Sequence, residues 1–102
     1  MELEKILHIS DNLEHDREVI ERLFETNIEG KVSGYLRKFD GKDDAEGRIE
    51  LFVSANASHR FDAKLVVNLD GESFRFERED YHKLDDLINH LFKHLKEALS
   101  DH

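Results

Sequence analysis

The stretch EDYHKLDDLINHLFKHLK, residues 79–96, decides the fold of this chain. From Leu84 onward its apolar residues recur every third or fourth position, which is the spacing of one face of an α-helix. This apolar stripe consists of Leu84, Leu87, Ile88, Leu91, Leu95 and Leu99. Asp80 stands just before it and is the expected N-cap, because a short polar side chain can accept a hydrogen bond from the first turn. The sequence therefore predicts an amphipathic helix that is entered directly from a strand.

Three strands are predicted before this helix, because apolar and polar residues alternate in three successive runs. The apolar positions are Ile49, Leu51 and Val53, then Phe61, Ala63, Leu65, Val67 and Leu69, then Phe74 and Phe76. Asp70 and Gly71 separate the last two runs and predict a two-residue type I′ hairpin, which needs positive φ angles. The connection before Phe61 must hold an odd number of residues, three or five, to keep Val53 and Phe61 on one face.

The first part of the chain predicts one strand and one long helix. Residues 4–10 form a short apolar run that we interpret as a strand, although a helical turn also fits. Asp11 and Glu14 then have the spacing of a capping box. The apolar residues that follow have helical spacing: Leu13, Ile20, Leu23, Phe24, Ile28, Val32, Tyr35 and Phe39.

This series predicts a helix over residues 12–39. A break near Thr26 and Asn27, or at Gly30, is the alternative, because Gly30 and Gly34 each weaken a helix by roughly 1 kcal/mol relative to Ala. The polar residues 40–47 are expected to form a surface loop.

This order predicts an α+β fold. It is a two-layer sandwich, β-α-β-β-β-α, with two helices packed on one face of a mostly antiparallel four-stranded sheet. We expect the helices to cover the face lined by Leu51, Leu65 and Phe74. The other face would keep Arg48, Glu50, Phe52, Arg60, Asp62, Lys64, Val66, Arg75 and Glu77. At 102 residues the chain, residues 1–102, is expected to be a single domain.

Composition excludes several classes of function. The chain has no cysteine, which excludes disulfides, thiolate zinc sites and cysteine nucleophiles. Its apolar runs are far shorter than the roughly 20 residues of a membrane span, so we expect a soluble, cytoplasmic protein with no membrane partner. The net charge of −9 argues against a polyanion partner, because phosphate neutralisation supplies most non-specific nucleic-acid affinity.

Two stretches nevertheless contain few acids. Lys31, Arg37 and Lys38 have only Glu29 in their stretch, and the second stretch holds His90, Lys93, His94 and Lys96. If the two helices pack side by side, these residues could form one basic stripe. The alternative is that they are only the solvated faces of two helices.

Other candidate sites have simpler interpretations. Asp86, His90 and His94 share one helical face, but they lack a metal-binding motif, so we predict no metal site. We expect Tyr81 to anchor the core. We expect Asp85 to be structural, because the helix dipole favours a carboxylate near the helix N-terminus. No phosphate-binding glycine loop or nucleophile motif is present, and the second helix lacks the basic start of a double-stranded RNA-binding domain. We therefore predict no enzyme, no cofactor and no small-molecule substrate.

Two stretches carry a resemblance to a known family. Glu79, Asp80 and Tyr81, followed by Leu84-Asp85-x-Leu87-Ile88 and Leu91-x-Lys93-His94-Leu95, resemble the last helix of the ribosome hibernation promoting factors, also called protein Y or sigma-54 modulation proteins. One family residue between Asp80 and Tyr81 is missing. The second stretch, IEGKVSGYLRKF at residues 28–39, is similar to the end of the family's first helix. The resemblance covers roughly residues 28–99.

The resemblance implies a ribosome-associated translation inhibitor. Members of this short-form family bind the small ribosomal subunit and its rRNA in dormancy or stress, through basic positions on their helices. The candidate RNA-binding residues are Lys31, Arg37, Lys38, His90, Lys93 and Lys96. Gly30, Gly34 and Glu97 replace bases that the family often has. The alternative is a diverged relative that no longer binds RNA and acts as a protein-interaction or self-associating module.

Overall fold

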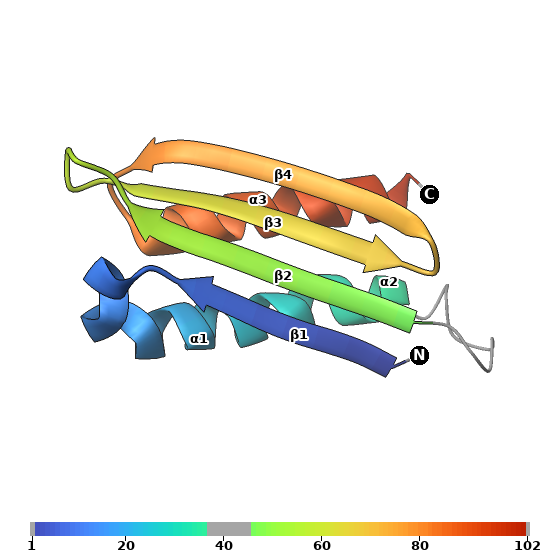
Figure 1. Ribbon diagram of the computed structural model, residues 1–102. Helices are drawn as coiled ribbons and strands as arrows, with labels where there is room; N and C mark the ends of the chain where they lie inside the picture. The colour runs from blue at the N-terminus through green and yellow to red at the C-terminus, as the bar shows by residue number, and fades with distance from the viewer. Residues whose placement is uncertain (1, 37–45, 102) are drawn as a thin grey trace.

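The computed structural model describes residues 2–36 and 46–101 of the chain (Figure 1). In chain order its elements are β1 (Glu2–Ile9), a 3₁₀ segment (Asp11–Asp16), α1 (Arg17–Asn27), a π-helical segment (Ile28–Val32), α2 (Ser33–Leu36), β2 (Glu46–Ala55), β3 (Phe61–Leu69), β4 (Glu72–Tyr81) and α3 (Leu84–Ser100). The four strands form one layer and the helices form a second layer behind it. The predicted two-layer α+β sandwich is confirmed.

The strands lie in the sheet in sequence order. β1 pairs in parallel with β2, whereas β2 with β3 and β3 with β4 are antiparallel. Asp70 and Gly71 have φ angles of 49° and 88°, as a type I′ hairpin requires, and Leu69 faces Glu72 across the turn. Residues 56–60 connect β2 to β3, which is the longer of the two predicted lengths.

The core lies between the sheet and the helices. Burial alternates along β2 and β3, so that each strand has a buried inner face and a more exposed outer face. Every residue of the predicted α3 stripe is buried, and so is Phe92, which the prediction omitted. Phe92 fits the same helical spacing, since it follows Ile88 by four residues and precedes Leu95 by three. Phe74, expected on the inner face, is half-buried because β4 is an edge strand.

The first helical region runs from Asp11 to Leu36 with three changes of helix type. Leu13, with φ −116° and ψ 17°, marks a kink within the 3₁₀ segment. The alternative break near Gly30 takes the form of a π turn, in which the backbone N–H of Ser33 reaches the carbonyl of Ile28 five residues earlier. The predicted end at Phe39 and the predicted loop 40–47, up to residue 45, lie outside the described residues.

The prediction that Asp80 caps the last helix is wrong. β4 continues to Tyr81, and Asp80 lies in a β-bulge where the pairing of β3 with β4 shifts register. Its φ is 60°, its carboxylate accepts a 2.6 Å hydrogen bond from Asn56, and its backbone N–H donates to Asp62. The extra residue of a bulge is left out of the ladder. The N-cap position belongs to Lys83, which makes no capping hydrogen bond.

Candidate nucleic-acid interface

The two acid-poor stretches meet where the first helical region packs along α3. Asn27, at the end of α1, donates its side-chain amide to the side-chain oxygen of Asn89 on α3 at 2.9 Å. One turn later, the ammonium group of Lys31 lies 3.5 Å from the backbone oxygen of Asn89. Beneath these polar contacts, Phe24 and Phe92 pack with tilted rings and centroids 6.1 Å apart. The two helices are therefore held side by side at the level of Lys31.

Two lysines of α3, Lys96 and Lys93, lie near Lys31. Burial lowers the pKa of Lys31, and the positive charges of Lys96 and Lys93 lower it further. Charges influence each other in this way only when they are close. Within residues 2–36 and 46–101, none of these three ammonium groups forms an ion pair with a carboxylate. We call Lys31, Lys93 and Lys96 the lysine cluster.

The π-helical segment accounts for the position of Lys31. The π turn is held by Ser33, because both the backbone N–H and the hydroxyl of Ser33 donate to the carbonyl of Ile28. Ile28 and Val32 are buried on either side of it. Lys31 is therefore the residue of this segment that lies partly buried beside α3, while Glu29 and Gly30 are exposed.

His90 does not join the lysine cluster. Its Nδ1 lies 2.7 Å from the hydroxyl of Tyr81, with the two rings edge to face, so His90 contacts the end of β4. His94 also turns toward β4, where its Nε2 accepts a 2.8 Å hydrogen bond from Arg78. The single basic stripe predicted from the sequence is thus divided between two sides of α3. Sequence reasoning missed Arg78, although alternation along β4 places it on the same face as Phe74 and Phe76, opposite the buried Ala63.

The remaining predictions for this region have different outcomes. Tyr81 packs against the core, as expected. Asp86, His90 and His94 do not converge, and the described part of the chain contains no group of three or more His, Asp and Glu side chains that could hold a metal ion. Arg37 and Lys38 lie outside the described residues.

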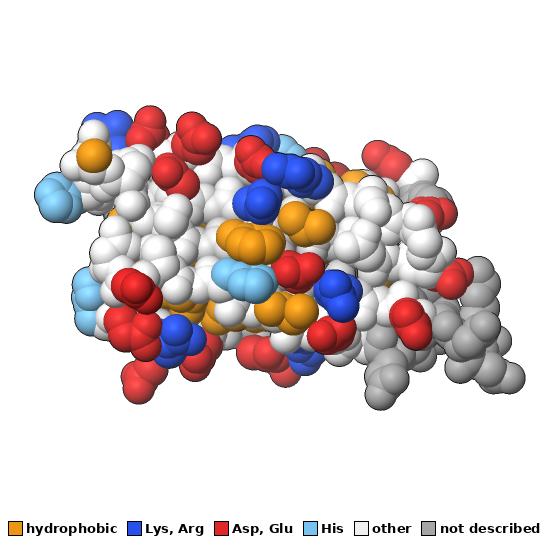
Figure 2. All heavy atoms as spheres, viewed as in Figure 1, with side chains coloured by type: hydrophobic (Ala, Val, Ile, Leu, Met, Phe, Trp, Pro, Cys, Tyr) orange, Lys and Arg blue, Asp and Glu red, His pale blue; other side chains and the backbone are white. Residues whose placement is uncertain are grey.

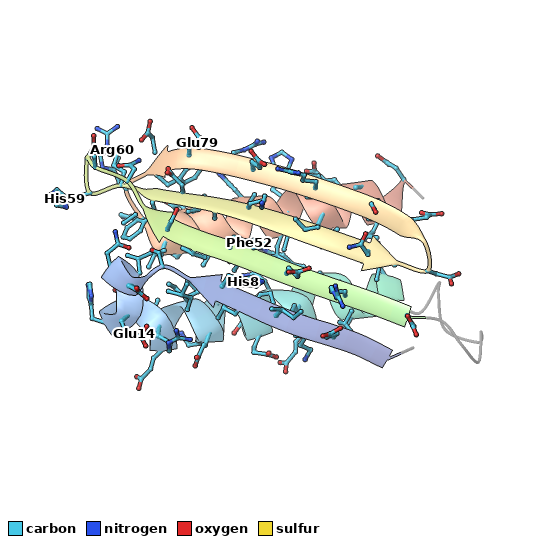
Figure 3. All side chains as sticks on the ribbon, in the orientation of Figure 1. His8, Glu14, Phe52, His59, Arg60 and Glu79 are labelled. Carbon is cyan, nitrogen blue, oxygen red and sulfur yellow. The ribbon has the colours of Figure 1, made fainter. Side chains whose placement is uncertain are left out.

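The outer face of the sheet has a different character. Figure 3 shows His8 and Phe52 side by side near its centre, and Figure 2 shows hydrophobic, histidine and charged side chains gathered in the middle of this face. Their rings stack with centroids 4.2 Å apart, and the ammonium group of Lys64 lies 4.4 Å from the Phe52 centroid. His8 also contacts the carboxylate of Glu50 at 3.0 Å. The cations of this face are therefore already in contact with carboxylates or with an aromatic ring.

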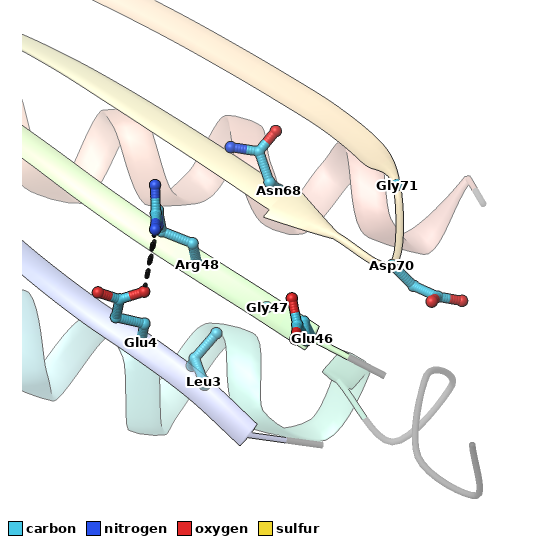
Figure 4. Close-up of a pocket in the computed structure, with 8 residues that line it drawn as sticks. All are labelled: Leu3, Glu4, Glu46, Gly47, Arg48, Asn68, Asp70 and Gly71. Atoms are coloured by element: carbon cyan, nitrogen blue, oxygen red, sulfur yellow. Dashed lines mark hydrogen bonds and ion pairs between the residues drawn. The ribbon is translucent and has the colours of Figure 1, made fainter. Parts of the chain in front are cut away.

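A hollow of about 670 Å³ opens at the end of the sheet that holds the β3–β4 turn (Figure 4). Arg48 crosses it and contacts the carboxylate of Glu4 at 3.2 Å. Its other lining side chains include Glu46, Asn68 and Asp70. Because the arginine is neutralised and the other charges are negative, this hollow is a poor site for a phosphate.

No helix within the described residues is long and apolar enough to cross a membrane. Neither family models nor curated proteins match the sequence. The fold is similar to the crystal structure of the N-terminal domain of Protein Y from Thermus thermophilus, with a TM-score of 0.51 and 22% sequence identity. The likeness covers 97% of this chain and 96% of that domain. It therefore extends over nearly the whole chain, beyond residues 28–99, and at this identity it shows a common fold.

Proposed function

We propose that this protein associates with the small ribosomal subunit and inhibits translation in dormancy or stress by binding ribosomal RNA with the lysine cluster. The observation that carries the proposal is the contact of Lys31 with Asn89 on α3, the helix that also carries Lys93 and Lys96. Two further facts support it. The fold is similar to a Protein Y domain, and the two stretches that resemble the ribosome hibernation family are the ones that supply Lys31 and Lys93.

The cluster suits a phosphate backbone better than it suits a protein carboxylate. Neutralising phosphates releases condensed counterions, which gives affinity without sequence specificity. Burial and the positive charges of Lys96 and Lys93 lower the pKa of Lys31, so an anion placed beside these lysines would favour the charged form of Lys31. The protein itself offers no described carboxylate in that place. Binding would therefore neutralise this region while the rest of the acidic surface limits other contacts with RNA.

Sedimentation with purified small ribosomal subunits tests the proposal. At low salt, wild-type protein should travel with the subunits through a gradient. The variant Lys31→Glu/Lys93→Glu/Lys96→Glu should stay at the top. The control, Arg22→Glu/Arg75→Glu/Lys83→Glu, alters net charge by the same amount at exposed sites outside the cluster, and it should still sediment with the subunits. If wild type fails to travel with them, or if both variants behave alike, the proposal is wrong.

A second candidate, self-association, is favoured by the centre of the outer sheet face. The register places twelve side chains there: Glu4, Ile6, His8, Arg48, Glu50, Phe52, Lys64, Val66, Asn68, Ser73, Arg75 and Glu77. Cations and carboxylates are equal in number, although the whole chain has a charge of −9. Two copies could approach through this face with little repulsion and bury Ile6, Phe52 and Val66.

Sedimentation equilibrium separates the two candidates. Self-association would give a concentration-dependent mass that persists in high salt, because burial of apolar surface does not depend on counterion release. Val66→Glu on the outer face should then abolish it. Val19→Glu is the matched control, since Val19 is an exposed valine on α1. A monomer at all concentrations would exclude this candidate.

A further inference from the structure

Asn27 is the one polar residue among the buried side chains of the described chain, with 4% of its surface exposed. Its amide donates to the carbonyl of Leu23 at 2.8 Å and to the side-chain oxygen of Asn89 at 2.9 Å. A buried amide that loses its partners costs about 1–3 kcal/mol, whereas replacing both partners of a pair by apolar groups can be neutral or stabilising. The pair is therefore a poor source of stability compared with two leucines.

Buried asparagines are known to serve another purpose in packed helices. A single asparagine in an apolar seam fixes the register of two helices at some cost in stability, because only one alignment satisfies its hydrogen bonds. In this protein the Asn27–Asn89 pair joins α1 to α3 one turn before Lys31. The backbone oxygen of Asn89 also accepts a hydrogen bond from Lys31 at 3.5 Å. Asn89 therefore contacts both Asn27 and Lys31.

The π turn between Asn27 and Val32 makes this register necessary. An α-helix advances about 100° per residue, so a turn with a different number of residues changes which side chain faces the neighbouring helix. Gly30, in the middle of the turn, has no side chain to oppose such a change, and a Cβ placed there would meet no atom within 4 Å. Ser33, Ile28 and Val32 hold the turn itself, and the asparagine pair just before it fixes how the turn is aligned with α3.

We propose that Asn27 and Asn89 are positioning residues, which hold the π turn in register with α3 so that Lys31 joins Lys93 and Lys96 in one site for a phosphate group. This inference rests on the proposed function for its effect on binding. The geometry of the cluster can be measured without any ribosome. The lowered pKa of Lys31 reports that geometry, since burial and the two neighbouring lysines are its causes.

The experiment uses the full chain with Asn27→Leu/Asn89→Leu. Its thermal unfolding should occur at the wild-type temperature or above it, because no buried amide is left without a partner. NMR titration of the lysine side chains should show the pKa of Lys31 rising toward the ordinary lysine value. The control Arg22→Leu/Asp86→Leu places two leucines at exposed positions of the same helices with no change of net charge, and it should leave the Lys31 pKa as in wild type.

Binding to small subunits supplies the second readout. The salt dependence of binding by the double variant should be shallower by about one in the slope of log K against log salt, because one phosphate contact is lost. A folded double variant with an unaltered Lys31 pKa overturns the inference. If wild type does not bind subunits, the proposed function fails, and the pKa measurement alone decides the inference.

Asn89→Ala covers the case in which the double variant does not fold. Asn27 then keeps its hydrogen bond to the Leu23 carbonyl. The same rise in the Lys31 pKa is expected, and its absence in this folded variant counts equally against the positioning role.

Discussion

At the scale of single residues, the surroundings of Lys31 disfavour its positive charge. Burial and two neighbouring lysines lower its pKa below the ordinary value of 10.5. A lowered pKa means that folding disfavours the charged form, so Lys31 reduces the stability of the folded state at neutral pH. Stability and binding therefore place opposite demands on this residue, as is common at functional sites.

The pH dependence of stability follows from this sign. Below the folded-state pKa of Lys31, both states hold the proton and the cost is fully present. As pH rises through that pKa toward 10.5, the unfolded chain binds more protons than the folded chain, and the free energy of unfolding rises. Urea unfolding of wild type and Lys31→Gln, compared between pH about 8 and about 10.5, should show this rise in wild type only. Equal slopes for the two proteins would contradict it.

At the scale of elements, α3 shows what periodicity can and cannot predict. Its apolar stripe follows from spacing alone, and Phe92 could have been found by the same rule. The start of the helix could not, because the role of Asp80 depends on Asn56 in the β2–β3 connection and on Asp62 near the start of β3, which are 24 and 18 residues away in the sequence. The lysine cluster was predicted only as a possibility, since its formation depends on the rotation of the helix in the π turn. The contact of His90 with Tyr81 could not be predicted either, because no local signal tells which side of α3 faces β4.

The correction at Asp80 leads to a stability prediction. Lys83 occupies the N-cap of α3 with extended φ and ψ angles and no capping hydrogen bond. Lys83→Asp should raise the free energy of unfolding by about 0.5–2 kcal/mol, because the carboxylate can accept a hydrogen bond from the first turn and lies at the positive end of the helix dipole. Lys83→Ala, which removes the charge without adding a cap, should gain less. A loss of stability in Lys83→Asp would show that the helix does not begin at Leu84.

A second prediction at this scale concerns the helix layer. Phe92 is fully buried and packs against Phe24 of α1. Phe92→Ala should lower the free energy of unfolding by about 3–5 kcal/mol, as is usual for a large aromatic residue removed from a core. Leu99→Ala, at the C-terminal end of the same stripe, should cost less than the Phe92 change because fewer atoms are removed. Chemical denaturation of both variants measures the difference, and equal losses would argue against a central role for Phe92.

At the scale of the whole molecule, charge is distributed unevenly. The chain carries −9 overall, the centre of the outer sheet face is balanced, and the lysine cluster is locally positive. If the lysine cluster binds RNA as proposed, it should do so through few contacts, since a repulsive body offers no second surface for the backbone, and the salt dependence should be correspondingly shallow. The proposed function makes the small subunit the partner on which this expectation is best examined.

The most direct test of the central claim is the salt dependence of binding to purified small subunits, measured for wild type and for Lys31→Glu/Lys93→Glu/Lys96→Glu. Each phosphate contact contributes about 0.7–0.9 to the slope of log K against log salt. If the lysine cluster holds the RNA, wild type should bind with a slope steeper than that of the variant by about two to three units. Wild-type binding with the same slope as the variant, or no binding by wild type at low salt, would contradict the account.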